Sequence, residues 1–352
     1  MQKLVEQFGQ TVRDAAQQQR PLRICGSGSK SFYGRAVPGD LLDVTPYRGI
    51  VSYEPTELVL TARAGTTLGE IETVLAANRQ ILAFEPPHFG NGATLGGCVA
   101  SGLSGPRRAS AGALRDYVLG VRIMDGNGAD LRFGGQVMKN VAGYDISRLM
   151  AGSLGTLGVL LEVSLKVLPL PAEETTLRFN MTEHQALDAM HRWAARPLSL
   201  SATCYHEGTL TVRLSGASAA VQSVSRKLGG EAVANAAFFW QSVREQSHPF
   251  FENADNLWRL SLPSVAPEIA LSGRQLIEWG GALRWLISGA SAETIRQTVT
   301  EVGGQATLFR SATVSDQPFH PLTASQMQLH RRLKQSFDPH HIFNIGRMYQ
   351  EI

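Results

Sequence analysis

Apolar and polar residues follow two different spacings along the first 170 positions of the chain. Short runs of β-branched and apolar residues, separated by glycine, proline and asparagine, are typical of strands joined by turns. Residues 67–79 follow a helical spacing instead, with Thr67 and Glu70 as a capping box at their start, and residues 145–152 predict a second, short helix. The predicted strands are residues 22–26, 41–45, 49–53, 57–65, 118–128, 129–134 and 158–171.

The pattern changes after Pro169 and Pro171. A strand, a helix, two strands, a helix and further strands follow one another, which predicts an α+β lobe built on an antiparallel sheet. The last 30 or so residues predict a helix and then a turn. The segments of the second lobe are residues 176–180, 186–197, 199–216, 219–230, 257–263, 281–289 and 292–310. We therefore predict an α+β protein with domains at residues 1–171 and 172–315 and a carboxy-terminal segment at 316–352.

Composition predicts a soluble, cytoplasmic protein without a membrane span. The 352 residues suffice for two domains, and no apolar run reaches the roughly 18 residues that a membrane helix needs. The amino terminus has a helical spacing and no cleavage site for a secretory signal. The net charge of +3 is spread along the chain, which argues against nucleic acid as a partner. Cys25, Cys98 and Cys204 lie far apart, so we predict reduced core thiols and no metal site.

Residues 24–31, ICGSGSKS, have the small side chains and the lysine of a phosphate-binding loop. A Walker A loop needs glycine at the positions of Ser29 and Ile24, and a dinucleotide fingerprint needs a third glycine where Ser31 stands. The following residues FYGRAVPGD also cannot form the long helix of a dinucleotide fold. Two interpretations remain, an anion-binding nest of backbone N–H groups and an ordinary glycine–serine turn.

Two further segments are rich in small residues and favour the first interpretation. Residues 92–105, GATLGGCVASGLSG, carry no charge, and residues 140–161 end in Gly152, Gly155 and Gly158 just before an apolar strand. Glycine at this density costs backbone entropy, so it usually reflects the close approach of another group. Three such segments in one domain favour a large, extended cofactor.

In this order the segments resemble the FAD-binding domain of the vanillyl-alcohol oxidase, or PCMH, type that many 2-hydroxyacid dehydrogenases share. The resemblance rests on GSGSK, AGTTLGEIETVLAANRQILAFEPP, ATLGGCVASGLSG, GSLGTLGVLLEVSLKVLP and the tail FDPHHIFNIGRM, and covers residues 10–170 and 335–348. On a chain of this length, NVAGYDISRLMAGS, YEPTELVLTARAGT and WGGALRW are similar to the FAD-binding subunits of bacterial glycolate oxidases.

The resemblance implies a PCMH-type domain of two subdomains over residues 1–171, a cap lobe over 172–315 and a tail that returns to the first domain. It also implies that the loop at residues 26–30 holds the FAD pyrophosphate. Gly34 and Arg35 stand where some members have a histidine bonded to the flavin, so we expect non-covalent FAD. The implied FAD-binding residues are Gly26, Ser27, Gly28, Ser29, Lys30, Pro86, Pro87, Thr94, Gly96, Gly97, Ser101, Gly112, Gly155, Gly158, Val159 and Asn344.

A 2-hydroxy acid would need a cation for its carboxylate and a base for its hydroxyl proton. Arg259 and Arg284 are the candidate cations, with structural or surface arginines as the alternative, and His341 is a candidate near the flavin. The metal-binding histidine motif of longer hydroxyacid dehydrogenases is missing. His184 and His191 lie seven residues apart without an acidic partner, which favours a solvated helix face.

The resemblance implies a hetero-oligomeric glycolate oxidase, in which a larger flavoprotein subunit oxidises a small 2-hydroxy acid and an iron–sulfur subunit takes the electrons. Any contact with the inner face of the plasma membrane would come through these partners. Two alternatives stay open: a self-sufficient FAD oxidoreductase for another alcohol or hydroxy acid, and an assembly subunit whose trough holds no cofactor.

Overall fold

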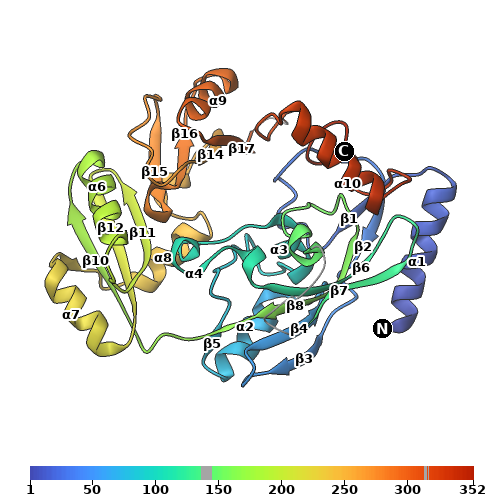
Figure 1. Cartoon of the computed structure of the whole chain (residues 1–352), viewed down its shortest axis with the longest axis horizontal. Helices are drawn as coiled ribbons and strands as arrows, with labels where there is room; N and C mark the ends of the chain where they lie inside the picture. The colour runs from blue at the N-terminus through green and yellow to red at the C-terminus, as the bar shows by residue number, and fades with distance from the viewer. Residues whose placement is uncertain (136–144, 313–314, 316) are drawn as a thin grey trace.

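A five-stranded antiparallel sheet is the centre of the first lobe (Figure 1). The computed structural model describes residues 1–135, 145–312, 315 and 317–352. The strands lie in the order β3 (Ile50–Glu54), β4 (Val59–Arg63), β8 (Val159–Lys166), β6 (Val118–Met124) and β7 (Asp130–Gly134). The central strand β8 is buried along its length except at Lys166, and its buried polar residues Glu162 and Ser164 are paired with Arg122 and Thr61.

Short helices cover one face of this sheet. Helix α2 (Leu68–Ala77) begins with the predicted capping box, in which Thr67 and Glu70 bond each other's backbone N–H groups. Helix α3 (Leu95–Ser101) runs through the small-residue segment at 92–105, where the sequence pattern predicted no helix. Thr94 caps its start, and Gly96 lets the helix approach the sheet closely, because a Cβ there would lie 2.8 Å from that of Ala64. The remaining short elements are α4 (Arg108–Ala111), α5 (Ile146–Leu149), β5 (Gln80–Ile81) and β9 (Leu168–Pro169).

A small subdomain packs on the other side of β8. Helix α1 (Gln2–Gln17) buries Val5, Phe8 and Val12 against the parallel pair β1 (Leu22–Cys25) and β2 (Asp40–Asp43). The carboxy-terminal segment extends this pair, because Phe343 bridges Leu22 in parallel register. The described part of the first lobe therefore has two subdomains, each with its own apolar core.

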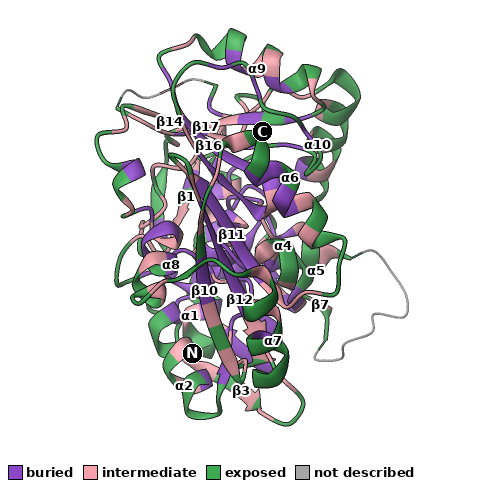
Figure 2. Cartoon of the chain, turned by 90° about the vertical axis from the view of Figure 1, so that its left-hand side faces the viewer, coloured by how far each residue is buried: buried purple, intermediate pink, exposed green. Residues whose placement is uncertain are grey.

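The second lobe is an eight-stranded antiparallel sheet with helices on its outer face. Its order is β13 (Glu231–Ala232), β10 (Glu173–Asn180), β12 (Thr209–Gly216), β11 (Leu200–His206), β15 (Arg274–Glu278), β16 (Leu283–Ile287), β14 (Asn256–Ser261) and β17 (Gln305–Ser311). Helices α6 (Glu183–Ala194), α7 (Ser218–Leu228) and α9 (Ala292–Glu301) bury their apolar stripes on it. Figure 2 shows β11 and β12 largely buried, with helices beside them whose outer faces are exposed, whereas β10 is buried only at Thr176 and Leu177.

The inner face of the cap sheet meets the first lobe. Helix α8 (Ala236–Arg244), which the sequence pattern did not predict, covers part of this face through Trp240 and Val243. Phe89 and Leu103 of the first lobe pack into the same apolar cluster. The two lobes thus share a core, and polar groups between them are removed from water.

Helix α10 (Ala324–Phe337) brings the chain back from the cap to the first lobe, where it lies beside β1 and β6 (Figure 1). The proposed domain boundaries at 171 and 315 fall between β9 and β10 and after β17. Among the described residues, no helix combines the length and the apolar character needed to cross a membrane.

Candidate functional site

A cavity of about 310 Å³ lies between the two subdomains of the first lobe. Its walls come from the loop after β1, from helix α3, from the segment around Leu154 and from the carboxy-terminal segment. The structure brings together in its lining nine of the residues implied to hold FAD: Gly26, Ser27, Gly28, Ser29, Lys30, Thr94, Gly97, Ser101 and Asn344. We call this space the diphosphate cavity.

The loop after β1 offers backbone donors to the diphosphate cavity. Gly28 has φ +76°, which turns the chain sharply, and its carbonyl accepts a hydrogen bond from the N–H of Ser31. The N–H groups of Ser27, Gly28 and Ser29 have no acceptor in the described part of the chain. Neighbouring N–H groups in such a turn form a concave anion site, so the donor set fits a diphosphate.

The charged side chains in the described lining of this cavity are all positive. Arg23, Lys30 and Arg347 contribute to it, and no carboxylate of the described residues does. Burial lowers the pKa of Lys30 below its usual value, and its Nζ donates only to the carbonyl of His88 (3.2 Å) and the hydroxyl of Ser29 (3.5 Å) within the described chain. Arg347 likewise donates there only to backbone carbonyls, those of Arg35, Ser31 and Lys30. A diphosphate would supply the negative charge that these cations lack.

Asn344 joins two walls of the cavity. Its Oδ1 accepts a hydrogen bond from the N–H of Ile24 (2.8 Å), and its Nδ2 donates to the carbonyl of Leu154 (2.7 Å). Gly155, at φ +73°, lies directly behind it, and a Cβ there would come within 2.6 Å of the Asn344 Nδ2. Both ends of the amide are thus used by the backbone of this chain.

A buried ion pair fixes the tail that carries Asn344. Lys334 and Asp338 are both fully buried, with Nζ and Oδ2 2.7 Å apart. Lys334 also donates to the carbonyls of Thr156 and Phe343, and Asp338 accepts from the N–H groups of Ile342 and Phe343. The ammonium of Lys334 and the carboxylate of Asp338 thus both form hydrogen bonds to the backbone near the diphosphate cavity.

Other residues implied to hold FAD lie outside the lining of this cavity. A Cβ on Gly96 would meet Ala64, and one on Gly158 would meet the carbonyl of Met124, so both glycines serve close packing. Val159 is buried in the core beside α1, and Gly112 ends α4 next to Asp116. Pro86 is buried in the same loop as Pro87, which lines a second cavity. The NVAGY part of the quoted motif, residues 140–144, lies outside the described residues.

The second cavity lies between the two lobes and is lined from both. Pro87, Phe89 and residues 103–106 face Arg259, Glu278 and Trp285 of the cap. Burial raises the pKa of Glu278 to about 7. We call this space the interlobe cavity.

The structure separates the two candidate arginines. Arg259 pairs with Trp285 across β14 and β16, while Arg284 pairs with Leu260, and successive side chains of a strand alternate between faces. Arg284 is therefore on the outer face, fully buried, where it donates to the carbonyl of Ala266 (2.8 Å). Arg284 lines neither cavity, and its contacts fit the alternative interpretation, in which it is a structural arginine.

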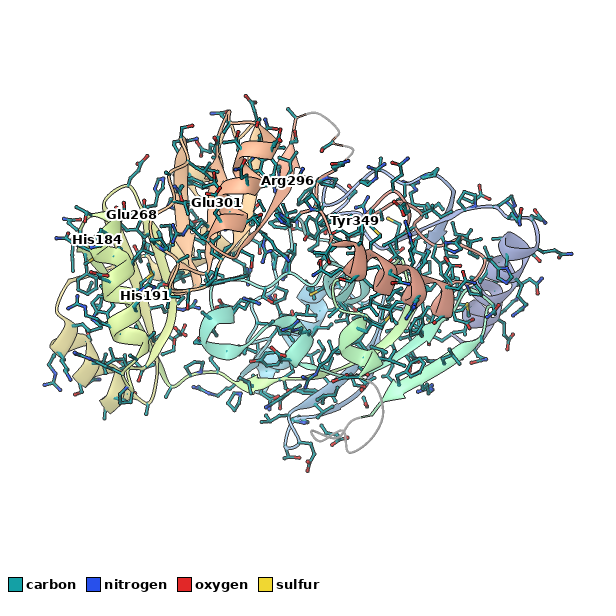
Figure 3. The ribbon with its side chains drawn as sticks, turned by 45° about the horizontal axis from the view of Figure 1, so that its top comes forward. His184, His191, Glu268, Arg296, Glu301 and Tyr349 are labelled. Carbon is teal, nitrogen blue, oxygen red and sulfur yellow. The ribbon has the colours of Figure 1, made fainter. Side chains whose placement is uncertain are left out.

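The candidate histidines also lie away from both cavities. His341 is exposed and its Nε2 lies 3.2 Å from Gln335. Figure 3 shows His184 and His191 on α6 at the outer end of the cap, where the His184 side chain lies 3.6 Å from that of Glu268. The described residues contain no group of three or more histidine, cysteine or acidic side chains placed to hold a metal ion.

Sequence reasoning missed several residues of these two sites. Arg347 stands in the quoted tail motif, so its position beside Asn344 was a usable signal. Glu278 ends β15, a short strand that was not predicted, and its place directly before the quoted segment WGGALRW was a usable signal only for its position, not for its burial. Glu245 accepts hydrogen bonds from the N–H groups of His88 and Phe89 and thereby ties the cap to the first lobe.

Comparison with known proteins agrees with this geometry. Residues 3–134 match the family of FAD binding domains. The chain is 51% identical to the glycolate oxidase subunit GlcE of Escherichia coli (strain K12), a match that covers 100% of this chain and 98% of that protein. It is 34% identical to the glycolate oxidase subunit GlcD of Bacillus subtilis (strain 168) over 36% of this chain and 27% of that one.

Two more distant likenesses concern the fold. A D-lactate dehydrogenase of Anaerostipes hadrus is 32% identical over 40% of this chain and 29% of its own. A solved structure of alkyldihydroxyacetonephosphate synthase superposes with a TM-score of 0.66 at 14% identity, covering 96% of this chain and 74% of that one. The likeness to that structure extends through both lobes. With its full-length match and its FAD-binding domain, the chain belongs to the family of the glycolate oxidase subunit GlcE.

Proposed function

We propose that this chain is the FAD-binding subunit of a glycolate oxidase complex, which oxidises glycolate to glyoxylate. The observation that carries the proposal is the diphosphate cavity, where three unpaired N–H groups and three cations of the described chain meet without a carboxylate. A diphosphate is the group of FAD that needs such surroundings. FAD, when bound, supplies the two-electron chemistry, and the protein supplies binding and orientation.

Each part of the cavity has its own role in this proposal. The N–H groups of Ser27, Gly28 and Ser29 hold the diphosphate, and Lys30 with Arg347 balances its charge. Helix α3 lines the cavity with Gly97 and Ser101, whose small side chains admit a flat or extended group. We propose that the FAD is held without a covalent bond, since Gly34 and Arg35 stand where some related proteins have a histidine bonded to the flavin.

The electrons must leave for other subunits. Cys98 and Cys204 are buried, burial raises the pKa of both thiols, and with Cys25 the chain has three cysteines, which do not provide the four thiolates of an iron–sulfur cluster. We therefore propose a larger flavoprotein subunit and an iron–sulfur subunit as partners. We place the complex in the cytoplasm, with contact to the inner face of the plasma membrane through those partners.

The test is to purify the chain alone and with its partner subunits and to measure flavin content and flavin bleaching by glycolate under anaerobic conditions. The proposal expects one dissociable FAD per chain, released by acid precipitation, and bleaching when the partners are present. Bleaching of the isolated chain at the full rate would favour the self-sufficient oxidoreductase. A chain that contains no flavin in either preparation would contradict the proposal and favour an assembly subunit.

A further inference from the structure

Arg259 and Glu278 both line the interlobe cavity and are not paired with each other. The guanidinium of Arg259 lies 5.4 Å from the centre of the Trp279 ring and makes no hydrogen bond or ion pair within the described residues. The carboxyl of Glu278 accepts a hydrogen bond from Trp285 at Oε1 (2.8 Å), whereas its buried Oε2 has no partner in the described chain. Buried polar atoms are normally satisfied, so the Oε2 of Glu278, which has no partner and faces the same cavity as the free guanidinium of Arg259, indicates a ligand.

The surroundings of Glu278 disfavour its charge. Burial is the main cause that raises its pKa to about 7, Glu85 of the first lobe adds to it, and Arg259 opposes it. The other ionisable groups that face it from packed elements are Arg244 on α8 and Cys204 on β11. Arg244 is engaged by Glu245 at 2.8 Å, and the thiol of Cys204 stays neutral because burial raises its pKa. A neutral Glu278 beside Arg259 therefore leaves one uncompensated positive charge in the cavity.

Backbone strain surrounds the same cavity. Phe89 has φ +51° and Trp279 has φ +55°, a conformation that residues other than glycine rarely adopt. Glu245 holds Phe89 in place through its N–H at 2.9 Å, and the Phe89 side chain is only half-buried. Strained residues that the surrounding structure holds in place are typical of ligand sites.

We propose that Arg259 and the protonated Glu278 bind the carboxylate and hydroxyl of a small 2-hydroxy acid between the two lobes. The inference rests on the proposed function, because it takes a hydroxy acid as the substrate class. The interlobe cavity encloses about 20 Å³, which is room for one water molecule. The acid therefore displaces this water, and the Phe89 side chain turns outward to enlarge the cavity. The carboxylate of a monoanionic acid matches the single positive charge of Arg259. The unpartnered Oε2 of Glu278 provides the second contact, to the hydroxyl of the acid.

The test is isothermal titration of glycolate into the flavin-loaded chain between pH 6 and pH 9. If the protonated carboxyl is required, affinity is level below pH 7 and falls by about tenfold for each further pH unit well above it. Binding then takes up a proton, which is detected because the observed binding enthalpy changes with the ionisation enthalpy of the buffer. Glu278→Gln, which imitates the neutral carboxyl, should keep binding and remove both the pH dependence and the proton uptake. Arg259→Met should weaken binding at least about tenfold at every pH. Arg274→Met, the same change on an exposed position of β15, is the matched control and should bind as the wild type does.

The outcomes separate this inference from the proposed function. Normal flavin content and glycolate bleaching in the complex, together with unchanged glycolate affinity in Arg259→Met, would overturn the inference and leave the proposed function standing. Glycolate binding that keeps its pH dependence in Glu278→Gln would also overturn it. Absence of flavin from the wild-type chain would instead contradict the proposed function.

Discussion

The two cavities are built in different ways. The diphosphate cavity is formed largely by backbone groups and small side chains from a few continuous segments, with Gly26, Gly28 and Gly97 in its lining beside the cations Arg23, Lys30 and Arg347. The interlobe cavity is formed by long side chains, and Arg259 and Glu278 come from different strands that only the sheet order brings together. Backbone sites leave a local signature of glycine and serine, whereas side-chain sites depend on register between distant segments.

The largest expected effect concerns the tail that closes the diphosphate cavity. Asp338→Ala leaves the Lys334 ammonium buried without its partner, and burial already lowers the pKa of this lysine. Removing one partner of a buried pair typically costs about 3–5 kcal/mol, so we expect a loss of this size in the free energy of unfolding, measured with urea. Flavin should be lost at lower urea concentration than in the wild type.

The matched control is the ion pair of Arg331 and Glu351, which joins the same helix to the tail at the surface. Both side chains are about half exposed, so Arg331→Ala should change the free energy of unfolding by less than about 1 kcal/mol. Equal effects of Asp338→Ala and Arg331→Ala would show that the buried pair does not fix the tail.

The next effect concerns the interlobe cavity and follows pH. The folded pKa of Glu278, about 7, lies above its ordinary value of 4.5, so its contribution to stability is complete below pH 4.5 and is lost as pH rises through 7. This pKa difference between the folded and unfolded chain corresponds to a loss of about 3 kcal/mol in the free energy of unfolding. Glu278→Gln removes this titration, and its free energy of unfolding relative to the wild type should therefore increase from pH 5 to pH 8. A constant difference across that range would mean that Glu278 is not desolvated.

A third effect tests the backbone character of the diphosphate cavity. Gly155→Val forces a β-branched residue to φ +73° and drives its Cβ toward the amide of Asn344. We expect the Kd for FAD to rise at least about tenfold, measured by fluorescence titration of the apoprotein. Gly208→Val is the control: φ is +76° there too, and no atom lies within 4 Å of the added Cβ. If both variants lose FAD equally, general destabilisation and not the cavity wall explains the result.

The elements and the backbone site of the first lobe could largely be predicted from the sequence. The local spacing of apolar and turn residues predicted every strand of the five-stranded sheet, and the glycine and serine residues indicated the loop at 26–30. It missed α3, because glycine has a low helix propensity and only packing on Ala64 and the cap at Thr94 make that helix favourable. Helix propensity is a weak guide wherever tertiary contacts decide.

Side-chain sites were less accessible to sequence reasoning. Arg259 and Arg284 were equivalent candidates, since each lies on a predicted strand beside a tryptophan. The register of β14 and β16 puts them on opposite faces of the cap sheet, and a shift of one residue would have exchanged them. Glu278 could not be found, because its role follows from its burial and not from a motif.

The smallest expected effect decides how Asn344 acts. The resemblance placed this residue beside the flavin, whereas the structure uses both ends of its amide to join Ile24 to Leu154. If it only fixes the walls, Asn344→Ala should cost about 1 kcal/mol of unfolding free energy, because two hydrogen bonds are lost but the freed groups lie at a cavity that water can enter. The Kd for FAD should then rise by less than about tenfold, since the diphosphate donors stay in place. A loss of FAD affinity much larger than the loss of stability would instead mean that the Asn344 amide contacts the cofactor directly.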